Sequence, residues 1–343
     1  MNKKMPVISL FSGAGVLDFA FESTGRYHTA VAIEYDKTFA GTIERNVQTG
    51  LMAVGEVVCA DVSRLTPARV AMHHGLRGKA AGVIGGPPCQ SFSSMGSKKG
   101  MRDSRGKLMF EFARWVKDLT PAFFVLENVP NFASINCGVP LRRLVREFSA
   151  NGYAVSHAVL NAADYGAPTT RKRLFIVGLR GARQFVFPSK THGDPRKHIV
   201  GDLLPWVTTA DAFHSLPTPS REPPGAPEGH VLVDHTPAVR QRFRSIPPGG
   251  YDYVRKRSRL SPTEPSKSLV AGNWQGARFH IHPIEPRELT NREAARVQGI
   301  PDAFLFEGDR IAVARQIANA VPLQLGQAIA EAVGRQLRKR GKS

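Results

Sequence analysis

Residues 7–18 read VISLFSGAGVLD, and this stretch decides the fold. The mostly apolar run Val7–Phe11 predicts a buried strand, and Gly13 and Gly15 predict a tight turn from that strand into a helix. Such a turn lets a ligand approach the backbone at the N-terminus of a helix. A dinucleotide-binding site carries a third glycine three residues further on, where this sequence has Asp18. The stretch therefore predicts a ligand-binding α/β protein and disfavours a nicotinamide dehydrogenase.

Strand-like runs alternate with helical stretches from this turn to Gly178. Between the runs, Asp36–Gln48 and Leu108–Leu119 carry apolar residues at helical spacing. This alternation predicts a largely parallel, Rossmann-like sheet covered on both faces. The last two runs lack a long intervening helix and predict an antiparallel hairpin at one edge, so the sheet is mixed. The predicted strands are Val7–Phe11, Ala30–Glu34, Val57–Ala60, Gly82–Ile84, Phe123–Glu127, Tyr153–Leu160 and Leu174–Gly178.

The composition changes after Arg180. Residues 181–286 hold 15 of the 25 prolines and predict a smaller, loop-rich domain. Helical spacing returns in Asn291–Gln298 and in Ile311–Val333. We expect one large domain from residues 1–180 and 311–343, a second from 181–286, and a hinge from 287–310 that returns to the large domain.

The charge of the chain indicates a polyanionic partner. Lys and Arg number 47 against 28 Asp and Glu, a net charge of +19, which favours nucleic acid over a membrane surface. One basic cluster follows the loop at residues 85–93, and a second is opposed only by Asp252. A solvated basic face is the alternative for both clusters. The first holds Lys98, Lys99, Arg102, Arg105 and Lys107, and the second Arg240, Arg242, Arg244, Arg255, Lys256, Arg257 and Arg259.

The cysteines and the apolar runs indicate the cellular compartment of the protein. No apolar run approaches the roughly 20 residues of a membrane span, and the N-terminal stretch does not predict a signal peptide. Cys59, Cys89 and Cys137 form no disulfide framework and have no metal-ligand spacing. We therefore expect a cytoplasmic protein without a metal site.

Cys89 lies in the loop GGPPCQSFS at residues 85–93, directly after a predicted strand. Pro87 and Pro88 stiffen this loop, and open α/β sheets place ligands and chemistry at such a sheet edge. A single cysteine is more often a small buried hydrophobic residue. The polar, Gly/Pro-built loop instead favours a reactive thiol.

Two carboxylates follow neighbouring predicted strands. Glu34 lies about 20 residues after the glycine turn, where a carboxylate accepts hydrogen bonds from ribose hydroxyls. Asp61 ends the third strand and is placed to accept from an adenine amino group. Phe11 and Tyr35 either sandwich the purine or belong to the core. These features predict an adenosine cofactor without a pyrophosphate, and S-adenosylmethionine fits best.

Three further charged residues point to chemistry. Glu127 ends the fifth strand on the same rim as Cys89 and is a candidate general acid/base, with a helix cap or a loop ion pair as the alternative. Arg171 and Arg173 open the last strand, and residues two apart in a strand share a face. We expect both to recognise a phosphate or a carbonyl, with solvated edge charges as the alternative.

These motifs, in this order, resemble the cytosine-5 DNA methyltransferases of the prokaryotic type. Only residues 181–270, roughly, have no counterpart, and there the family keeps its variable target-recognition domain. Four positions depart from the family pattern without removing a reacting group: Ser9, Val16, Thr169 and Ala318. The matching segments are Phe11–Leu17, Gly86–Ser93, Arg105–Leu108, Glu127–Val129, Tyr165–Arg173, Arg287–Asp302 and Arg315–Pro322.

The resemblance implies methyl transfer from S-adenosylmethionine to C5 of a flipped cytosine in a short, specific duplex DNA site. It implies that Cys89 adds to C6, that Glu127 holds the base and that Arg173, beside Arg171, contacts its carbonyl. The expected cofactor-binding residues are Phe11, Gly13, Ala14, Gly15, Glu34, Tyr35, Asp61, Val62, Pro87, Leu108, Asn319 and Val321. Expected at the DNA are Gln90, Ser91 and Arg105, together with Arg240, Arg242, Arg244, Arg255, Lys256, Arg257 and Arg259.

The expected partners follow from the same resemblance. They are double-stranded DNA and, in function only, a separately encoded restriction endonuclease, unless the enzyme is a solitary methylase. We expect a monomer in a bacterial or archaeal cytoplasm, associated with the nucleoid. Two alternatives stay open, a tRNA cytosine methyltransferase on the same scaffold and a catalytically silent DNA-binding protein.

Overall fold

The computed structural model describes residues 4–76, 80–88, 107–181, 184–197, 201–220, 227–270 and 279–340. The chain divides into two compact units, neither of which is continuous in sequence. Unit 1 comprises Met1–Leu160, Lys172–Pro188 and Gly326–Ser343, and unit 2 comprises Asn161–Arg171 and Ser189–Leu325.

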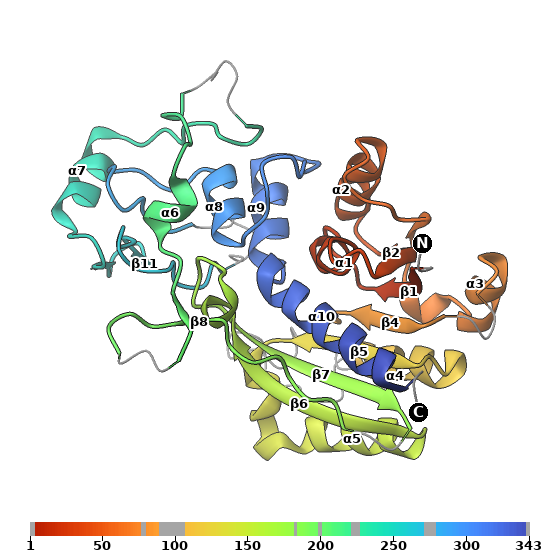
Figure 1. Ribbon diagram of the computed structural model, residues 1–343. Coiled ribbons are helices and arrows are strands. Elements are labelled where there is room, and N and C mark those ends of the chain that lie inside the picture. The colour runs from red at the N-terminus through yellow and green to blue at the C-terminus, as the bar shows by residue number, and fades with distance from the viewer. Residues whose placement is uncertain are drawn as a thin grey trace. The chain divides into compact units, whose positions relative to one another are not determined.

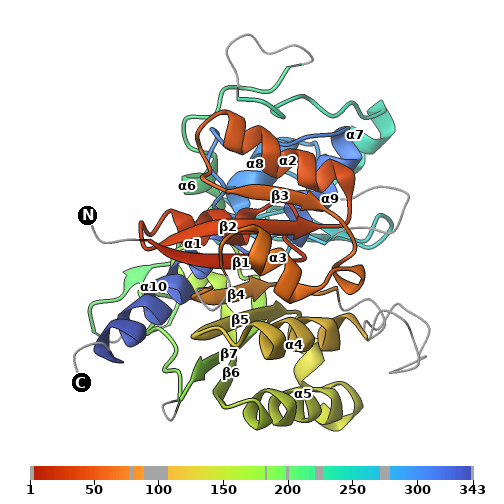
Figure 2. The same cartoon turned by 90° about the vertical axis from the view of Figure 1, so that its right-hand side faces the viewer.

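Unit 1 is built on a seven-stranded mixed sheet with the order β3-β2-β1-β4-β5-β7-β6 (Figures 1 and 2). The five strands from β3 to β5 pair in parallel, and β7 pairs antiparallel to β5. This confirms the predicted mixed α/β sheet. The strands are β1 Met5–Leu10, β2 Tyr27–Glu34, β3 Glu56–Cys59, β4 Gly82–Gly85, β5 Phe123–Asn128, β6 Tyr153–Asn161 and β7 Lys172–Arg180.

The edge pair β6–β7 is the predicted antiparallel hairpin. At one end of the pair, the Ala162 amide donates to the Arg171 carbonyl. At the other end, the Gly181 amide donates to the Gly152 carbonyl. The paired residue number rises from 171 to 181 along β7 while it falls from 162 to 152 along β6, so the two strands are antiparallel.

Helices cover both faces of this sheet, with α4 and α5 on one face and α1 and α10 on the other (Figure 2). Phe124 points to the first face, where it stacks on Phe148 of α5. Phe123 points to the second face, where its ring contacts Tyr27. Strand side chains therefore alternate between two apolar layers. The helices of unit 1 are α1 Val16–Glu22, α2 Lys37–Gln48, α3 Pro67–His73, α4 Leu108–Leu119, α5 Val139–Ala150 and α10 Leu323–Arg340, with the short η1 Val62–Arg64, η4 Pro130–Ala133 and η5 Ile135–Gly138.

The prediction of one helix over Ile311–Val333 is wrong. The structure has two helices there, α9 Arg310–Asn319 and α10. Ala320 leaves the helix with an extended backbone, at φ −57° and ψ 146°. Pro322 has no amide hydrogen and disfavours helical geometry at the residue before it, so the apolar spacing continues across a break in the backbone.

Unit 2 has little regular structure within its described residues, as predicted for the proline-rich segment. A small apolar cluster of Phe243, Ile246 and Ile281 forms beside several buried charges. Arg287 holds both carboxylate oxygens of Glu293 at 2.8 and 2.7 Å. The elements of unit 2 are α6 Thr209–Phe213, α7 Pro237–Ser245, α8 Asn291–Val297 and α9, with the short η6 Ala162–Tyr165 and the two-residue strands β8 His192–Gly193, β9 Leu204–Pro205, β10 Tyr251–Asp252 and β11 Arg257–Ser258.

Among the described helices of both units, none combines the length and the apolar character that crossing a membrane requires.

Candidate active site

The site lies where four parallel neighbouring strands of unit 1 end. The C-terminal ends of β3, β2, β1 and β4 lie side by side, because these strands are parallel and adjacent in the sheet. Ligands bind at this edge in open α/β sheets. These strand ends and the loops that follow them carry most of the predicted cofactor residues of unit 1 and the first residues of the Cys89 loop.

The glycine turn after β1 is tied to the end of β2. The Gly13 amide donates to Glu34 Oε2 at 2.7 Å, and the Asp36 amide donates to Glu34 Oε1 at 2.9 Å. Burial raises the pKa of Glu34, while these two backbone hydrogen bonds oppose that rise. The Glu34 carboxylate is thus fixed in place beside the turn.

The same turn combines strain with open space. Phe11, Gly13 and Gly15 all have positive φ, and at Phe11 this left-handed backbone is uncommon for a residue with a side chain. No atom lies within 4 Å of the position that a Cβ on Gly13 would occupy, whereas a Cβ on Gly15 would stand 2.9 Å from Ile43 Cγ1. Gly15 and the adjoining Ala14 therefore form the packed side of the turn, and Gly13 the open side.

Asp61 and Val62 follow β3. Asp61 accepts hydrogen bonds from the Ser63 amide and hydroxyl, and these bonds lower its pKa. Val62 is buried, and its carbonyl accepts from Trp115 Nε1. Asp61 therefore caps η1, and its side chain stays 30% exposed.

The aromatic residues proposed to hold a purine differ in their surroundings. Phe11 packs against the core cluster of the sheet, and Tyr35 is 76% exposed. Leu108 is the first residue of α4. Asn319, at the end of α9, is exposed, and Val321 is buried; both belong to unit 2. The assignment of these residues to the cofactor stays a prediction.

Asp18 is a buried acid directly after the glycine turn. It lies in the first turn of α1 and has no exposed surface. Burial raises its pKa from 3.8 to about 7; the negative charges of Glu22 and Glu34 add to this rise, and the Ser9 hydroxyl opposes it.

Asp18→Asn is expected to change the pH dependence of stability. Between about pH 4 and pH 7 the folded chain holds a proton on Asp18 that the unfolded chain has lost, so stability falls as the pH rises through this window. Asparagine has no proton to release, so the stability of the variant does not fall in this window. Its free energy of unfolding, compared with that of wild type, should rise by at most about 4 kcal/mol from pH 4 to pH 8. Urea unfolding at both pH values measures the difference. Asp118→Asn, on the exposed side of α4, is the matched control, and equal profiles for Asp18→Asn and wild type would contradict the assignment.

Asn128 anchors the start of the Cys89 loop. Its Nδ2 donates to the Pro87 carbonyl at 3.0 Å and approaches Met109 Sδ at 3.3 Å. No role was expected for Asn128 from the sequence, although it lies between Glu127 and Val129 in a matching segment. Cys89, Gln90, Ser91 and Arg105 lie outside the described residues.

Glu127 and Arg173 form a buried ion pair. Arg173 Nε lies 2.7 Å from Glu127 Oε1, and the two side chains are 10% and 11% exposed. A Cβ on Gly86 would stand 2.9 Å from Glu127 Oε2, so the backbone before Pro87 passes against this carboxylate. Burial raises the pKa of Glu127, and the Arg173 charge offsets only part of that rise.

Arg171 and Arg173 do not share a partner. Arg171 belongs to unit 2, where its guanidinium donates to the carbonyls of Leu269 and Ala318. The two guanidinium groups thus have different partners among the described residues, and the expectation that both recognise a phosphate or a carbonyl stays a prediction.

The basic cluster of residues 240–259 also divides. Arg257 is buried, pairs with Glu288 and lies over the Phe243 ring, and Arg259 is buried and donates to four backbone carbonyls. Both guanidinium groups therefore stabilise the interior of unit 2, contrary to their predicted place on a DNA-binding surface. The other members of the cluster, Arg240, Arg242, Arg244, Arg255 and Lys256, are exposed.

The β10–β11 hairpin carries exposed aromatic residues that the sequence analysis did not name. Tyr253 is 84% exposed, Val254 is 69% exposed, and the Tyr251 and Tyr253 rings meet edge to face. The buried Asp252 accepts hydrogen bonds from the amides of Val254 and Arg255, which fixes the tip of the hairpin. In the sequence, this surface is indicated by two tyrosines that lie between Arg244 and Arg255 of the basic cluster.

A family model for C-5 cytosine-specific DNA methylases matches residues 5–335. The chain belongs to this family. This DNA cytosine-5 methyltransferase uses S-adenosylmethionine as its methyl donor.

Relatives and solved structures match this methyltransferase over 71% to 98% of its length. The type II methyltransferase M.SacI of Streptomyces achromogenes is 32% identical over 98% of this chain and 94% of its own. M.AquIA of Picosynechococcus is 38% identical over 71% of this chain and 99% of its own. A prophage-encoded DNA modification methyltransferase from E. coli superposes with a TM-score of 0.78 at 26% identity, over 98% of this chain and 100% of that one. The Entamoeba histolytica methyltransferase EhMeth shares the fold, with a TM-score of 0.68 at 15% identity over 98% and 99% of the two chains.

Proposed function

We propose that this enzyme methylates cytosine through a covalent bond between Cys89 and C6 of a base flipped out of duplex DNA. The observation that carries the proposal is the buried Glu127–Arg173 pair against Gly86, three residues before Cys89. The stiff loop thus carries Cys89 a short way along the chain from a buried acid and a fixed cation. Such a pair suits a reaction in which negative charge develops on a ring.

The chain's own groups account for the steps on cytosine. C5 is a weak nucleophile until a thiolate adds to C6, and Cys89 supplies that thiolate. As the C–S bond forms, the ring electrons move toward N3 and O2. Glu127, whose pKa burial raises, donates a proton to N3, and Arg173 stabilises O2. The activated C5 then takes the methyl group that S-adenosylmethionine supplies. Loss of the C5 proton to solvent re-forms the C5–C6 double bond and breaks the C6–S bond, which releases the Cys89 thiolate, and N3 returns its proton to Glu127.

The residues at the ends of β1, β2 and β3 fit S-adenosylmethionine. Gly13 leaves open space beside the backbone, and the fixed Glu34 carboxylate is placed to accept from ribose hydroxyls. Asp61 is placed to accept from the adenine amino group. When bound, the cofactor supplies an electrophilic methyl group, and these residues hold it in place.

Unit 2 supplies the surface that reads the target in this proposal. Flipping a base costs a few kcal/mol, and contacts to phosphates from exposed arginines and lysines offset that cost. The exposed basic residues of the cluster flank the hairpin in the sequence, and Arg242 lies 3.4 Å from Asp252 within it. The role of residues 181–286 as the target-recognition domain, like the boundaries predicted for it, is part of this proposal.

Tyr253→Ala is expected to weaken binding to duplex DNA about tenfold or more, because stacking of an aromatic ring on a base contributes about 1–3 kcal/mol. Tyr253→Phe keeps the ring and should bind as wild type does. Fluorescence anisotropy at fixed salt measures both affinities. An alanine variant with wild-type affinity would place the recognition surface elsewhere on unit 2.

Labelled S-adenosylmethionine tests the function as a whole. The enzyme is incubated with chromosomal DNA or with tRNA, and the products are hydrolysed to nucleosides. We expect label in 5-methyldeoxycytidine from DNA and none from tRNA. Label only in the RNA, or on an exocyclic nitrogen, would overturn the proposal.

The names of the relatives support a further part of the proposal. Several are named type II methyltransferases. We propose that the enzyme protects DNA against a cognate restriction endonuclease and acts as a monomer.

A further inference from the structure

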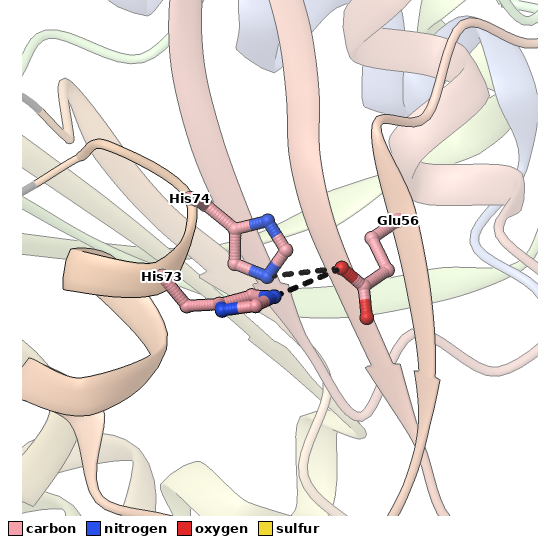
Figure 3. Close-up of side chains that lie close together, drawn as sticks. All are labelled: Glu56, His73 and His74. Atoms are coloured by element: carbon pink, nitrogen blue, oxygen red, sulfur yellow. Dashed lines mark ion pairs between the residues drawn. The ribbon is translucent and has the colours of Figure 1, made fainter.

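Three potential metal ligands converge at one end of the sheet edge in unit 1 (Figure 3). His74 Nε2 lies 3.4 Å and His73 Nε2 lies 4.0 Å from Glu56 Oε2. One ligand atom from each of the three residues lies within 4.8 Å of the others. Figure 3 shows both imidazole rings pointing toward the Glu56 carboxylate.

The local fold presents both histidines from one helix end. His73 is the last residue of α3, and His74 follows it. The Gly75 amide donates to the Met72 carbonyl and the Leu76 amide donates to the Ala71 carbonyl, which together form a Schellman motif. Gly75 has a φ of 64°, as this helix ending requires. The backbone of both histidines is therefore fixed, although the two residues are adjacent and would point apart on a continuing helix.

The third ligand comes from a different element. Glu56 is the first residue of β3, the edge strand of the sheet. The His74 side chain is 14% exposed and sits closest to it, whereas Glu56 and His73 are 47% and 77% exposed. The buried His74 ring is therefore held in place, and the exposed Glu56 and His73 side chains leave a path by which an ion can enter from solvent.

An ion pair alone accounts poorly for this arrangement. His73 Nε2, at 4.0 Å from Glu56 Oε2, is too far for a hydrogen bond, yet its exposed ring points at this oxygen instead of into solvent. Two imidazole nitrogens and a carboxylate oxygen are a ligand set that suits Zn²⁺. Magnesium prefers oxygen ligands and octahedral geometry, so this set discriminates against it.

We propose that Glu56, His73 and His74 bind one Zn²⁺ ion, with water completing its coordination. The ion would join the edge strand β3 to the end of α3. An edge strand presents unpaired backbone groups, and tying it down limits fraying and pairing with other chains. Glu56 begins β3, whereas Asp61 follows its opposite end, so the ion should affect stability and leave methyl transfer unchanged.

Zinc titration of the full-length, untagged protein after removal of metal by chelation tests the proposal. Calorimetry with ZnCl₂ should show one site, and His74→Gln and Glu56→Gln should each weaken it at least tenfold. His157→Gln, an exposed histidine on β6, is the matched control and should keep the wild-type affinity. MgCl₂ should give no binding.

Thermal unfolding gives a second readout that does not depend on enzyme activity. Saturating Zn²⁺ should raise the melting temperature of wild type by about 2 °C or more, because an ion that binds only the folded chain stabilises it. The rise should vanish in His74→Gln while its melting temperature without metal stays near that of wild type. Equal zinc affinity in wild type and His74→Gln would overturn the site. So would the absence of binding by wild type at ZnCl₂ concentrations up to about 1 mM.

Discussion

Cys89→Ser is expected to abolish methyl transfer to DNA, leaving less than a few per cent of the wild-type rate. A serine hydroxyl is far less ionised than a thiol and is a weaker nucleophile, so it cannot add to C6 at neutral pH. The basic residues that follow the Cys89 loop in the sequence are expected to favour the thiolate in the wild-type enzyme. Incorporation of labelled methyl groups into duplex DNA measures the loss.

The affinity of Cys89→Ser for DNA separates chemistry from binding. Because the hydroxyl keeps the size of the thiol, the variant should bind duplex DNA within about twofold of wild type and should unfold at the same temperature. Methyl transfer above a few per cent of the wild-type rate in a folded Cys89→Ser would remove the residue from the reaction.

Glu127→Gln is expected to lower the rate of methyl transfer by about 10²- to 10⁴-fold. Glutamine keeps the shape of the side chain but cannot supply a proton to N3. Removing the carboxylate also leaves the Arg173 guanidinium buried without its charged partner, 2.7 Å from where Oε1 stood. Single-turnover kinetics with saturating S-adenosylmethionine measures the chemical step.

Two comparisons define the role of Glu127. Its glutamine variant should keep the KM for S-adenosylmethionine within a factor of about two, because the cofactor residues belong to other strands. Glu111→Gln on α4, which breaks the Arg114 pair instead, is the matched control. An unchanged rate with a raised cofactor KM in Glu127→Gln would assign the residue to cofactor binding.

The regular elements of unit 1 are largely predictable from sequence, because glycine and proline mark where apolar periodicity stops. The bounds predicted for α4 match those observed, and each predicted strand of unit 1 exists. The break between α9 and α10 was missed because apolar spacing at Ile317, Val321 and Leu325 continues through Pro322. A periodic pattern reports which face is buried, and it does not report whether the backbone stays helical.

The site was predictable only in part. Strand ends identify Glu34, Asp61 and Glu127, because parallel neighbouring strands bring their ends together. Burial of Arg257 and Arg259 was not predictable, since it depends on Glu288 and on carbonyls such as that of Pro283, about 25 to 30 residues away. A charged residue in sequence is expected to be exposed, and partners distant in sequence reverse that expectation.

The convergence of Glu56 with His73 and His74 was equally hidden. Their spacing follows no metal-binding pattern, and the contact depends on where α3 ends relative to β3.

Trapping on 5-fluorocytosine tests the central claim, the covalent bond between Cys89 and cytosine, most directly. Fluorine at C5 cannot leave as a proton does, so the bond to C6 persists once the methyl group has been transferred. Wild-type enzyme, S-adenosylmethionine and duplex DNA with 5-fluorocytosine in place of cytosine should give a complex that survives a denaturing gel. Its peptide map should place the DNA on Cys89, and Cys89→Ser should give no complex. An enzyme that methylates ordinary DNA but forms no such complex, or forms it on another residue, would contradict the account.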